Sequence, residues 1–344
     1  MDNKKSCGFV ALLGEPNAGK STLLNYMVGT KISIVTHKVQ TTRRRIRGVS
    51  ILGDSQIIFI DTPGLFQPKR RLDRAMVKAA WSGAVDSDVI VFLIEANRGV
   101  TSGVKENLKK LREFKDFPVS VAVAINKIDR VKSEELLKLT KEINEEYEFE
   151  KTFLISAKKG HGVNNLKEWL AGKLPIEEWL YPDDQIADLP LRTIMAEIMR
   201  EKLTLRLHQE LPYQLTVETE GWEDRPDGSV KIDQLIYVAR DGHKGIILGP
   251  NGSTIKSINI AARKEMETFL EKKVHLFCQL KVRPKWLDEK EDFELGGDPD
   301  AKLKKKRMDD MVLSNALQKL DDAMSGIMST LKFAGGGKVV DLSS

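Results

Sequence analysis

The run from Gly14 to Ser21 constrains the fold of this 344-residue chain more than any other feature of its sequence. It fits the pattern G-x-x-x-x-G-K-S, follows the apolar run Phe9–Leu13 and precedes a stretch with helical spacing. In this context glycines let backbone N–H groups turn towards phosphate oxygens, and the start of the helix adds positive potential. The pattern predicts a phosphate-binding loop in which Lys20 reaches the β- and γ-phosphates and Ser21 binds Mg²⁺. The alternative is an ordinary glycine-rich turn, which the strand–loop–helix context disfavours.

The rest of the first half alternates short apolar runs with stretches of helical spacing. Apolar strands separated by helices are typical of a parallel sheet that is buried on both faces and has right-handed crossovers. We predict an α/β domain with a mostly parallel, doubly wound sheet over residues 1–174, and a linker over 175–190, where Pro175, Pro182 and Pro190 break the pattern. The expected strands are Phe9–Leu13, Arg45–Leu52, Gln56–Ile60, Val89–Ile94, Val119–Ile125 and Lys151–Ile155, and two expected helices are Leu72–Val85 and Glu134–Glu145.

Composition excludes several classes of protein. Hydrophobic residues make up 41% of the chain and charged residues 31%, as in a soluble globular protein and unlike a disordered, collagen-like or coiled-coil one. The apolar runs fall far short of the roughly 18 residues that a membrane-spanning helix needs, and we expect no cleaved signal peptide. Two cysteines, Cys7 and Cys278, cannot form a disulfide framework, so we expect a reducing, cytoplasmic compartment.

The net charge of +5 is unevenly divided. Residues 1–175 have a surplus of ten positive charges, whereas residues 176–344 have a surplus of five negative ones. Taken alone, this division favours a nucleic-acid surface in the first half. Local charge indicates the second half instead, because ten basic and four acidic side chains lie between Arg240 and Lys285.

Three further motifs follow expected strands in the first half. Asp61-Thr62-Pro63-Gly64 follows the third strand, and its aspartate can hold Mg²⁺ through water while the Gly64 N–H contacts the γ-phosphate. Asn126-Lys127-Ile128-Asp129 follows the fifth strand, and its carboxylate can accept two hydrogen bonds from guanine that adenine does not offer. Ser156-Ala157-Lys158 follows the sixth strand. Because the carboxyl ends of parallel strands meet in one crevice, these motifs together predict a guanine-nucleotide site.

The predicted nucleotide contacts come from all four motifs. They are Gly14, Glu15, Pro16, Asn17, Ala18, Gly19, Lys20, Ser21, Thr22, Asp61, Thr62, Pro63, Gly64, Asn126, Lys127, Asp129, Ser156, Ala157 and Lys158. A threonine before the second strand can close over the nucleotide and bind Mg²⁺ when the γ-phosphate is present, which makes the segment a switch. We assign this role to Thr42, with Thr41 as the alternative, so the predicted metal ligands are Ser21, Thr42 and Asp61. A solvated charged edge is the simpler role for at least some of Arg43–Arg45 and Arg47.

Residue 65 bears on hydrolysis. Many GTPases place a glutamine there to orient the attacking water, but this chain has Leu65, which cannot hydrogen-bond water. Backbone positioning, a monovalent cation or a partner must replace it. The side-chain oxygen of Asn17 could bind a K⁺ ion that bridges the phosphates. The predicted catalytic set is therefore Asn17, Lys20, Thr42 and Gly64.

The second half predicts a smaller α+β domain over residues 191–295, with the order α-β-β-α-β. The run Ile246-Ile247-Leu248-Gly249-Pro250-Asn251-Gly252 follows its second strand and precedes a helix. This I-I-x-G-x-x-G pattern is typical of a KH domain, whose glycines let the backbone approach a sugar-phosphate chain. A plain helix-initiating turn is the alternative. We expect Ile246, Ile247, Ile255 and Ile258 to form an apolar groove for bases. The predicted RNA contacts are Lys244, Ile247, Gly249, Pro250, Asn251, Gly252 and Lys256.

Residues 296–344 form a C-terminal extension in the predicted organisation. The basic run Lys304–Arg307 precedes an apolar stripe, from Met308 to Leu331, that repeats at three and four residues, which predicts an amphipathic helix. Packing against the chain's own surface is the simplest role for this helix. Contact with a ribosome or a membrane surface is the alternative.

The combination of a guanine-nucleotide domain and a KH-like domain resembles the bacterial Era family of ribosome-assembly GTPases. The resemblance runs from about Gly8 to Trp286 and includes Gln40–Arg43, Asp61–Leu65 and Arg240–Gly242. It implies a P-loop GTPase domain followed by a type II KH domain, with GTP/GDP and Mg²⁺ bound. It also implies binding near the 3′ end of 16S rRNA during maturation of the small ribosomal subunit, release on hydrolysis, a monomeric state and loose association with the inner membrane.

Two other functions fit the same motifs. One is a signalling GTPase whose second domain binds protein or a membrane, and the other is an RNA-binding scaffold in which the nucleotide is structural. RNA binding that depends on the nucleotide favours the switch, and the absence of bound RNA favours the signalling role. RNA binding that ignores the nucleotide favours the scaffold.

Overall fold

The computed structural model describes residues 5–36, 38, 42, 46–66, 71–112, 119–208 and 211–284. These residues belong to one compact unit, Met1–Glu294. The predicted extension over 296–344 lies outside the described residues. None of the helices within the described ranges combines the length and the apolar character needed to cross a membrane.

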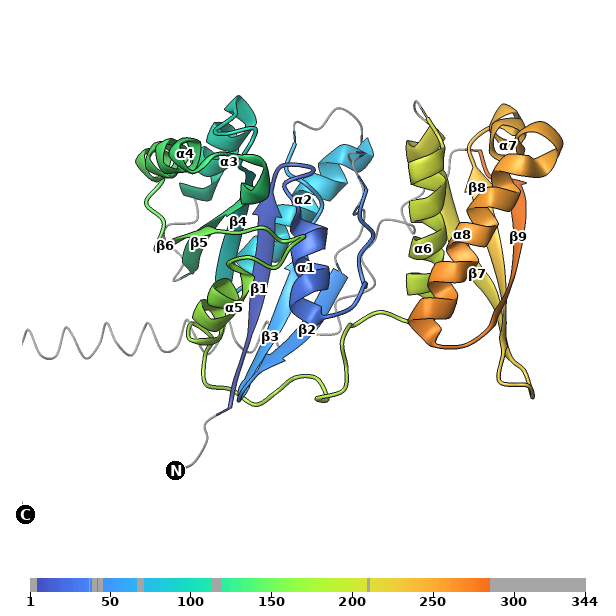
Figure 1. Ribbon diagram of the computed structural model, residues 1–344, viewed down its shortest axis with the longest axis horizontal. Coiled ribbons are helices and arrows are strands. Elements are labelled where there is room, and N and C mark those ends of the chain that lie inside the picture. Colours follow the sequence, from blue (N-terminus) through green and yellow to red (C-terminus); the bar gives the residue numbers. More distant parts are fainter. Residues whose placement is uncertain are drawn as a thin grey trace, which may run out of the picture. The chain divides into compact units, whose positions relative to one another are not determined.

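The first domain is built on a six-stranded sheet in the order β2-β3-β1-β4-β5-β6 (Figure 1). Only β2 and β3 pair antiparallel within this sheet, and the other neighbouring strands run parallel. The predicted mostly parallel sheet is therefore confirmed. The strands are β1 (Ser6–Gly14), β2 (Ile46–Leu52), β3 (Ser55–Asp61), β4 (Val89–Glu95), β5 (Ser120–Asn126) and β6 (Lys151–Leu154).

Helices cover both faces of this sheet. They are α1 (Lys20–Val28), α2 (Arg71–Val85), α3 (Ser102–Leu111), α4 (Ser133–Glu146) and α5 (Val163–Ala171), and a short 3₁₀ turn, η2 (Ile128–Arg130), follows β5. Successive side chains of a strand point to opposite faces. Accordingly Val10 and Leu12 of β1 pack in the core beneath α1 and α5, whereas Ala11 and Leu13 pack in the core beneath α2, α3 and α4. Burial on both faces is the physical reason for the uninterrupted apolar runs in the sequence.

The predicted linker is built onto the edge of the sheet. Val49 of β2 donates its N–H to the carbonyl of Ile186 (3.0 Å), and Asp188 donates its N–H to the carbonyl of Arg47 (3.1 Å). The side chain of Arg47 also pairs with Asp188 at 3.3 Å. The linker thus pairs with part of the edge that β2 would otherwise expose.

The second domain contains a three-stranded sheet in the order β7-β8-β9. Strand β8 pairs antiparallel with β7 and parallel with β9, and helices α6 and α8 pack together with the sheet around one apolar core (Figure 1). The elements are α6 (Leu191–Arg206), η3 (Leu211–Tyr213), β7 (Leu215–Asp224), β8 (Val230–Val238), α7 (Asp241–Leu248), η4 (Pro250–Gly252), α8 (Ser253–Leu270) and β9 (Val274–Val282). The predicted α-β-β-α-β order omits α7, which the structure places between β8 and α8.

Candidate functional site

The loop between β1 and α1 has the backbone that phosphate binding requires. Asn17 and Gly19 have positive φ values of 67° and 101°, so the chain reverses within a few residues before α1 begins. A Cβ atom at Gly19 would lie 2.2 Å from Nδ2 of Asn126. Glycine is therefore required there by both conformation and space.

Lys20 points back into this loop. Its Nζ donates hydrogen bonds to the carbonyls of Gly14 (2.9 Å) and Glu15 (3.0 Å). Burial lowers the pKa of Lys20 to about 8, although the charges of Asp61 and Glu15 raise it in part. A polyphosphate in the loop would supply negative charge and favour the ammonium form.

Three hydroxyl groups converge on Asp61. Its Oδ2 accepts hydrogen bonds from Ser21 Oγ (2.8 Å), Ser33 Oγ (2.8 Å) and Thr42 Oγ1 (3.2 Å). Its Oδ1 is buried and has no hydrogen-bond partner among the described residues. Burial raises the pKa of Asp61, against the opposing effects of Lys20 and the three hydroxyls.

This donor set fits Mg²⁺, a hard cation that takes oxygen ligands and usually few protein groups. Within the described ranges no cluster of three or more His, Cys, Asp or Glu side chains could hold a metal ion. The predicted ligands Ser21, Thr42 and Asp61 lie together, and Ser33 joins them without having been predicted. Thr41, the alternative to Thr42, lies outside the described residues.

The segment after β3 packs directly on the phosphate-binding loop. A Cβ at Gly64 would come within 2.8 Å of the Pro16 nitrogen, and Leu65 donates its N–H to the Gly14 carbonyl at 2.9 Å. The side chain of Leu65 is 1% exposed and packs in the core beneath α2 and α3. It therefore faces away from solvent as well as lacking a polar group.

One buried amide joins the loops at the other end of the site. Asn126 donates through Nδ2 to the Ala18 carbonyl (2.8 Å), and its Oδ1 accepts from the N–H groups of Lys127 (2.8 Å) and Ala157 (2.9 Å). Ser156 Oγ donates to Asp129 Oδ1 at 2.6 Å, which lowers the pKa of Asp129. The exposed Asp129 carboxylate is thereby ionised and oriented.

These loops surround a cavity of about 650 Å³, within the usual range of about 300–1,000 Å³ for small-molecule sites. The predicted residues that line it are Pro16, Asn17, Gly19, Lys20, Ser21, Thr22, Thr42, Thr62, Gly64, Asn126, Lys127, Asp129, Ser156, Ala157 and Lys158. The predicted residues Gly14, Glu15, Ala18, Asp61 and Pro63 are not among the lining residues. Sequence reasoning missed other lining residues: Ile34, Val35, Thr36, Lys38, Glu95, Arg98, Arg130 and Leu205. Leu205 belongs to α6 of the second domain.

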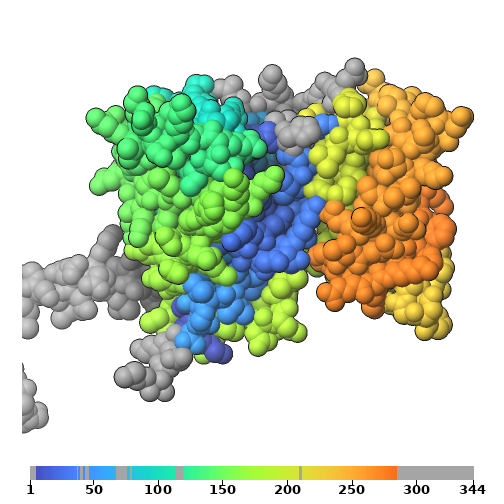
Figure 2. Space-filling view, in the orientation of Figure 1, coloured from blue at the N-terminus to red at the C-terminus, as the bar shows by residue number. Residues whose placement is uncertain are grey.

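The predicted RNA-binding residues divide between the surface and the core of the second domain. Pro250, Asn251 and Lys256 are exposed, and Asn251 has a left-handed backbone with φ 48°. Gly249 and Gly252 are half-buried, and so is Lys244, whose ammonium lies 3.4 Å from the carboxylate of Asp241. Part of the α7 and α8 surface is exposed in the space-filling view (Figure 2).

The expected apolar groove needs correction. Ile247 is 0% exposed and Ile258 is 2% exposed, and both pack in the core shared with α6 and the sheet. Ile246, the preceding residue, is 59% exposed. The unpredicted helix α7 is the reason, because it turns adjacent residues to different faces. Ile247 is thus a core residue, and Ile246 is the apolar side chain that α7 exposes beside it.

Two family models match this chain. One, described as a 50S ribosome-binding GTPase, covers residues 9–127, and the other, described as a KH domain, covers residues 210–287. GTPase Era of Dinoroseobacter shibae is 67% identical over 287 residues, which are 83% of this chain and 93% of that protein. This chain belongs to the Era family of GTPases. GTPase Era of Mesorhizobium japonicum is 55% identical over 290 residues, which are 84% of this chain and 93% of that protein.

Solved structures of Era proteins have the same fold. A complex of Era with MgGDPNP and nucleotides 1506–1542 of 16S ribosomal RNA matches with a TM-score of 0.80 and 37% identity, over 85% of this chain and 99% of that one. A variant of Era from Aquifex aeolicus bound to GDP·AlF₄⁻ matches with a TM-score of 0.79 and 38% identity, over the same shares. The predicted family and its two-domain fold are therefore confirmed, and the chain is a GTPase by membership.

Proposed function

We propose that this chain is a GTP-binding and GTP-hydrolysing switch that binds 16S rRNA near its 3′ end and assists assembly and maturation of the small (30S) ribosomal subunit. One observation carries the proposal: a guanine-nucleotide cavity and an exposed KH loop lie on a chain similar to an Era that holds MgGDPNP and nucleotides 1506–1542 of 16S rRNA. GTP favours the RNA-bound form in this proposal, and hydrolysis promotes release.

The phosphates of GTP bind at the start of α1. The backbone N–H groups of the loop and the positive end of the helix attract the oxygens, and Lys20 exchanges its carbonyl partners for the β- and γ-phosphates. Ser21, Thr42 and Asp61 would hold Mg²⁺, which would neutralise phosphate charge when bound. Oδ1 of Asp61 supports this assignment, because it has no hydrogen-bond partner among the described residues and a buried carboxylate oxygen is costly without one.

The base binds between the loops that follow β5 and β6. The carboxylate of Asp129 accepts hydrogen bonds from the N1–H and 2-amino groups of guanine, and the Ser156 hydroxyl keeps it ionised and aimed. Adenine has neither donor at that edge. A site built to pair with substrate donors discriminates strongly against analogues that lack them.

Hydrolysis proceeds without a side chain at position 65 that can orient water. The core packing of Leu65 supports this reading. The N–H of Gly64 would contact the γ-phosphate. The side-chain oxygen of Asn17 would hold a K⁺ ion, which would supply positive charge as an arginine finger does in other GTPases. Both residues line the cavity.

RNA lies along the loop from Gly249 to Gly252. Lys244 and Lys256 meet its phosphates, and the exposed side chain of Ile246 packs against a base in place of Ile247. A monomeric state and peripheral association with the cytoplasmic face of the inner membrane complete the proposal. Both come from the family resemblance, and sedimentation and vesicle flotation of the full chain test them.

The test is binding of the full chain to a labelled RNA with the 3′-terminal sequence of 16S rRNA, with GDP or a non-hydrolysable GTP analogue. We expect tighter binding with the analogue, and weaker binding by Lys256→Ala. The matched control, Lys141→Ala, removes a lysine that is 81% exposed on α4 and should not change binding. No RNA binding in either state would favour the signalling alternative, and equal binding in both would favour the scaffold.

A further inference from the structure

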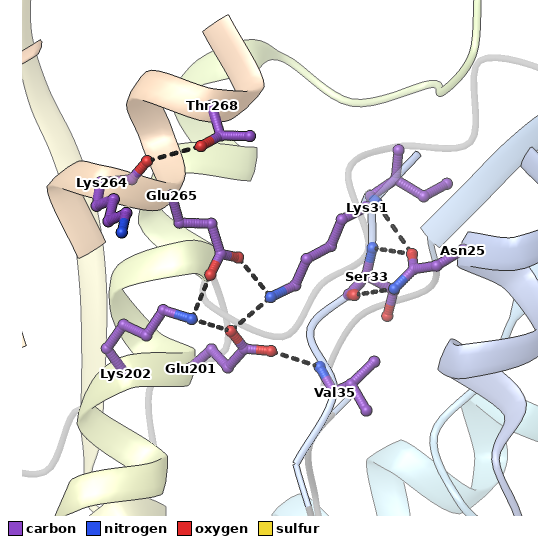
Figure 3. A network of polar contacts seen from close by, with 10 residues as sticks. Asn25, Lys31, Ser33, Val35, Glu201, Lys202, Lys264, Glu265 and Thr268 are labelled. Atoms are coloured by element: carbon purple, nitrogen blue, oxygen red, sulfur yellow. Dashed lines mark hydrogen bonds and ion pairs between the residues drawn. The ribbon is translucent and has the colours of Figure 1, made fainter. Parts of the chain in front are cut away.

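A compact cluster of four charged side chains lies between the segment that follows α1 (residues 31–36 and 38) and the helices α6 and α8 (Figure 3). The four side chains are those of Lys31, Glu201, Lys202 and Glu265. Glu201 of α6 accepts from Lys31 Nζ (2.6 Å) and Lys202 Nζ (2.8 Å) through Oε2, and Glu265 of α8 pairs with the same two lysines. The side chain of Glu201 is 3% exposed. Two positive and two negative charges balance, as the burial of Glu201 requires.

Glu201 also binds the backbone of the same segment. Its Oε1 accepts the N–H of Val35 at 2.8 Å (Figure 3). One carboxylate thus binds the side chain of Lys31 and the backbone of Val35, four residues farther along. Hydrogen bonds from Lys202, Lys31 and Val35 outweigh burial and lower the pKa of Glu201. The carboxylate is therefore ionised and accepts three hydrogen bonds.

The first domain holds this segment from the other side. Asn25 of α1 accepts from the N–H groups of Ile32 (3.0 Å) and Ser33 (2.9 Å), and it donates to the Ser33 carbonyl at 2.7 Å. Farther along, Lys38 Nζ donates to the carbonyls of Thr204 (2.6 Å) and Leu207, at the C-terminal end of α6. Backbone and side-chain contacts with both domains thus hold the segment.

The same segment forms one wall of the nucleotide cavity. Ile34, Val35, Thr36 and Lys38 line the cavity together with Leu205 of α6. Ser33 Oγ donates to Oδ2 of Asp61. Glu201, which is not among the lining residues, is therefore joined by a single hydrogen bond to Val35 of the wall.

We propose that Glu201 is a positioning residue through which the second domain holds this wall of the cavity and slows release of the bound guanine nucleotide. The inference rests on the proposed function, because it takes the cavity to hold that nucleotide. A bound nucleotide leaves when the wall moves away, and the Glu201 contacts bias the wall towards its closed position. Linkage then requires that a ligand which moves α6 changes the affinity for the nucleotide, and that the nucleotide changes the affinity for that ligand by the same factor.

The test is the release of fluorescent mant-GDP from the full chain, chased with excess GDP. Glu201→Gln keeps the size of the side chain but loses its charge. We expect release to accelerate by about five- to tenfold, which corresponds to a barrier to release that is lower by about 1.0–1.4 kcal/mol. The association rate should change little, whereas the melting temperature should fall, because the variant leaves Lys31 and Lys202 with one charged partner fewer. Glu197→Gln is the matched control, because Glu197 lies one turn earlier on α6 and pairs with Arg200 of the same helix.

A second variant protects the test against misfolding of the first. Lys31→Met removes the same ion pair from the first domain and leaves Glu201 with Lys202 and the Val35 N–H. Its release should also accelerate, and the double variant should fall short of the product of the single effects, since the two residues share a contact. Release at the wild-type rate in both single variants, or equal acceleration in Glu197→Gln, would overturn the inference alone. Failure of the wild type to bind mant-GDP would overturn the proposed function as well.

Discussion

Asn126 provides a quantitative test of how the nucleotide loops are held together. Its side chain is 2% exposed and makes three hydrogen bonds, to the Ala18 carbonyl and to the N–H groups of Lys127 and Ala157. These bonds join the loop between β1 and α1 to the loops that follow β5 and β6. Asn126→Ala leaves three backbone groups without that partner.

The structure sets the size of the effect. A buried polar group that loses its partner costs about 1–3 kcal/mol, and water entering the space left by the amide offsets part of that cost. We therefore expect the unfolding free energy of the first domain to fall by about 3–5 kcal/mol relative to wild type. Affinity for mant-GDP should fall by at least about tenfold, which corresponds to about 1.4 kcal/mol. The reason is that the loops proposed to hold the phosphates and the base lose the Asn126 hydrogen bonds that join them.

Urea unfolding followed by circular dichroism measures the first effect, with two transitions fitted for the two domains. Asn144→Ala is the matched control, since Asn144 makes two hydrogen bonds at the exposed surface of α4, with Thr140 and Thr152. The control should stay within about 0.5 kcal/mol of wild type. A loss below about 1 kcal/mol in Asn126→Ala, or a loss equal to that of the control, would refute the reasoning.

Three further predictions concern ions and protons. GTP hydrolysis should be at least about tenfold faster in potassium than in sodium, and Asn17→Ala should remove the difference; equal rates in both salts would contradict the cation role. Thr42→Ala should raise the Mg²⁺ concentration needed for half-maximal hydrolysis, whereas Thr41→Ala should not, and the opposite result would assign the ligand to Thr41. In nucleotide-free protein the pKa of Lys20 is lowered from 10.5 to about 8. The unfolded state therefore binds more protons between those values, and the stability of wild type relative to Lys20→Met should rise by about 2–3 kcal/mol from about pH 8 to about pH 10. Urea unfolding at both pH values checks this, and a constant difference would contradict it.

The nucleotide site could be predicted from sequence because its chemistry is local. Each motif lies at the carboxyl end of an apolar strand, and a parallel sheet brings those ends to one edge. The expected strands match β1 to β6 closely, with the largest difference at the start of β1, since burial on both faces leaves an apolar run that is easy to recognise. The predicted set therefore contains most of the residues that line the cavity.

Helix α7 and its packing were less accessible to sequence reasoning. The run Asp241–Leu248 holds two glycines and only eight residues, so it shows little helical periodicity. Without the helix, Ile246 and Ile247 look equivalent, and the structure separates them into a surface residue and a core residue. The packing of α7 against the rest of the second domain determines which of the two isoleucines is buried, and the local sequence pattern does not show it.

The contacts between Glu201, Lys31 and Val35 could not be predicted at all. Their partners lie 166 and 170 residues apart in the chain. A glutamate on a helix with lysine beside it is typical of a solvated face. Only the fold brings α6 to the segment after α1, and there the glutamate is buried.

The pairing of the linker with β2 changes where the first domain ends. Gln56 of β3 accepts the N–H groups of Leu180 and Tyr181 (2.9 and 3.1 Å), and β2 pairs with residues 186–188 beyond them. A fragment cut at residue 174 would keep all six strands. It would nevertheless expose the free edge of β2 and leave the buried amide of Gln56 without its partners from Leu180 and Tyr181. The self-sufficient fragment therefore runs to about Leu189, and a shorter one invites edge-to-edge association between copies.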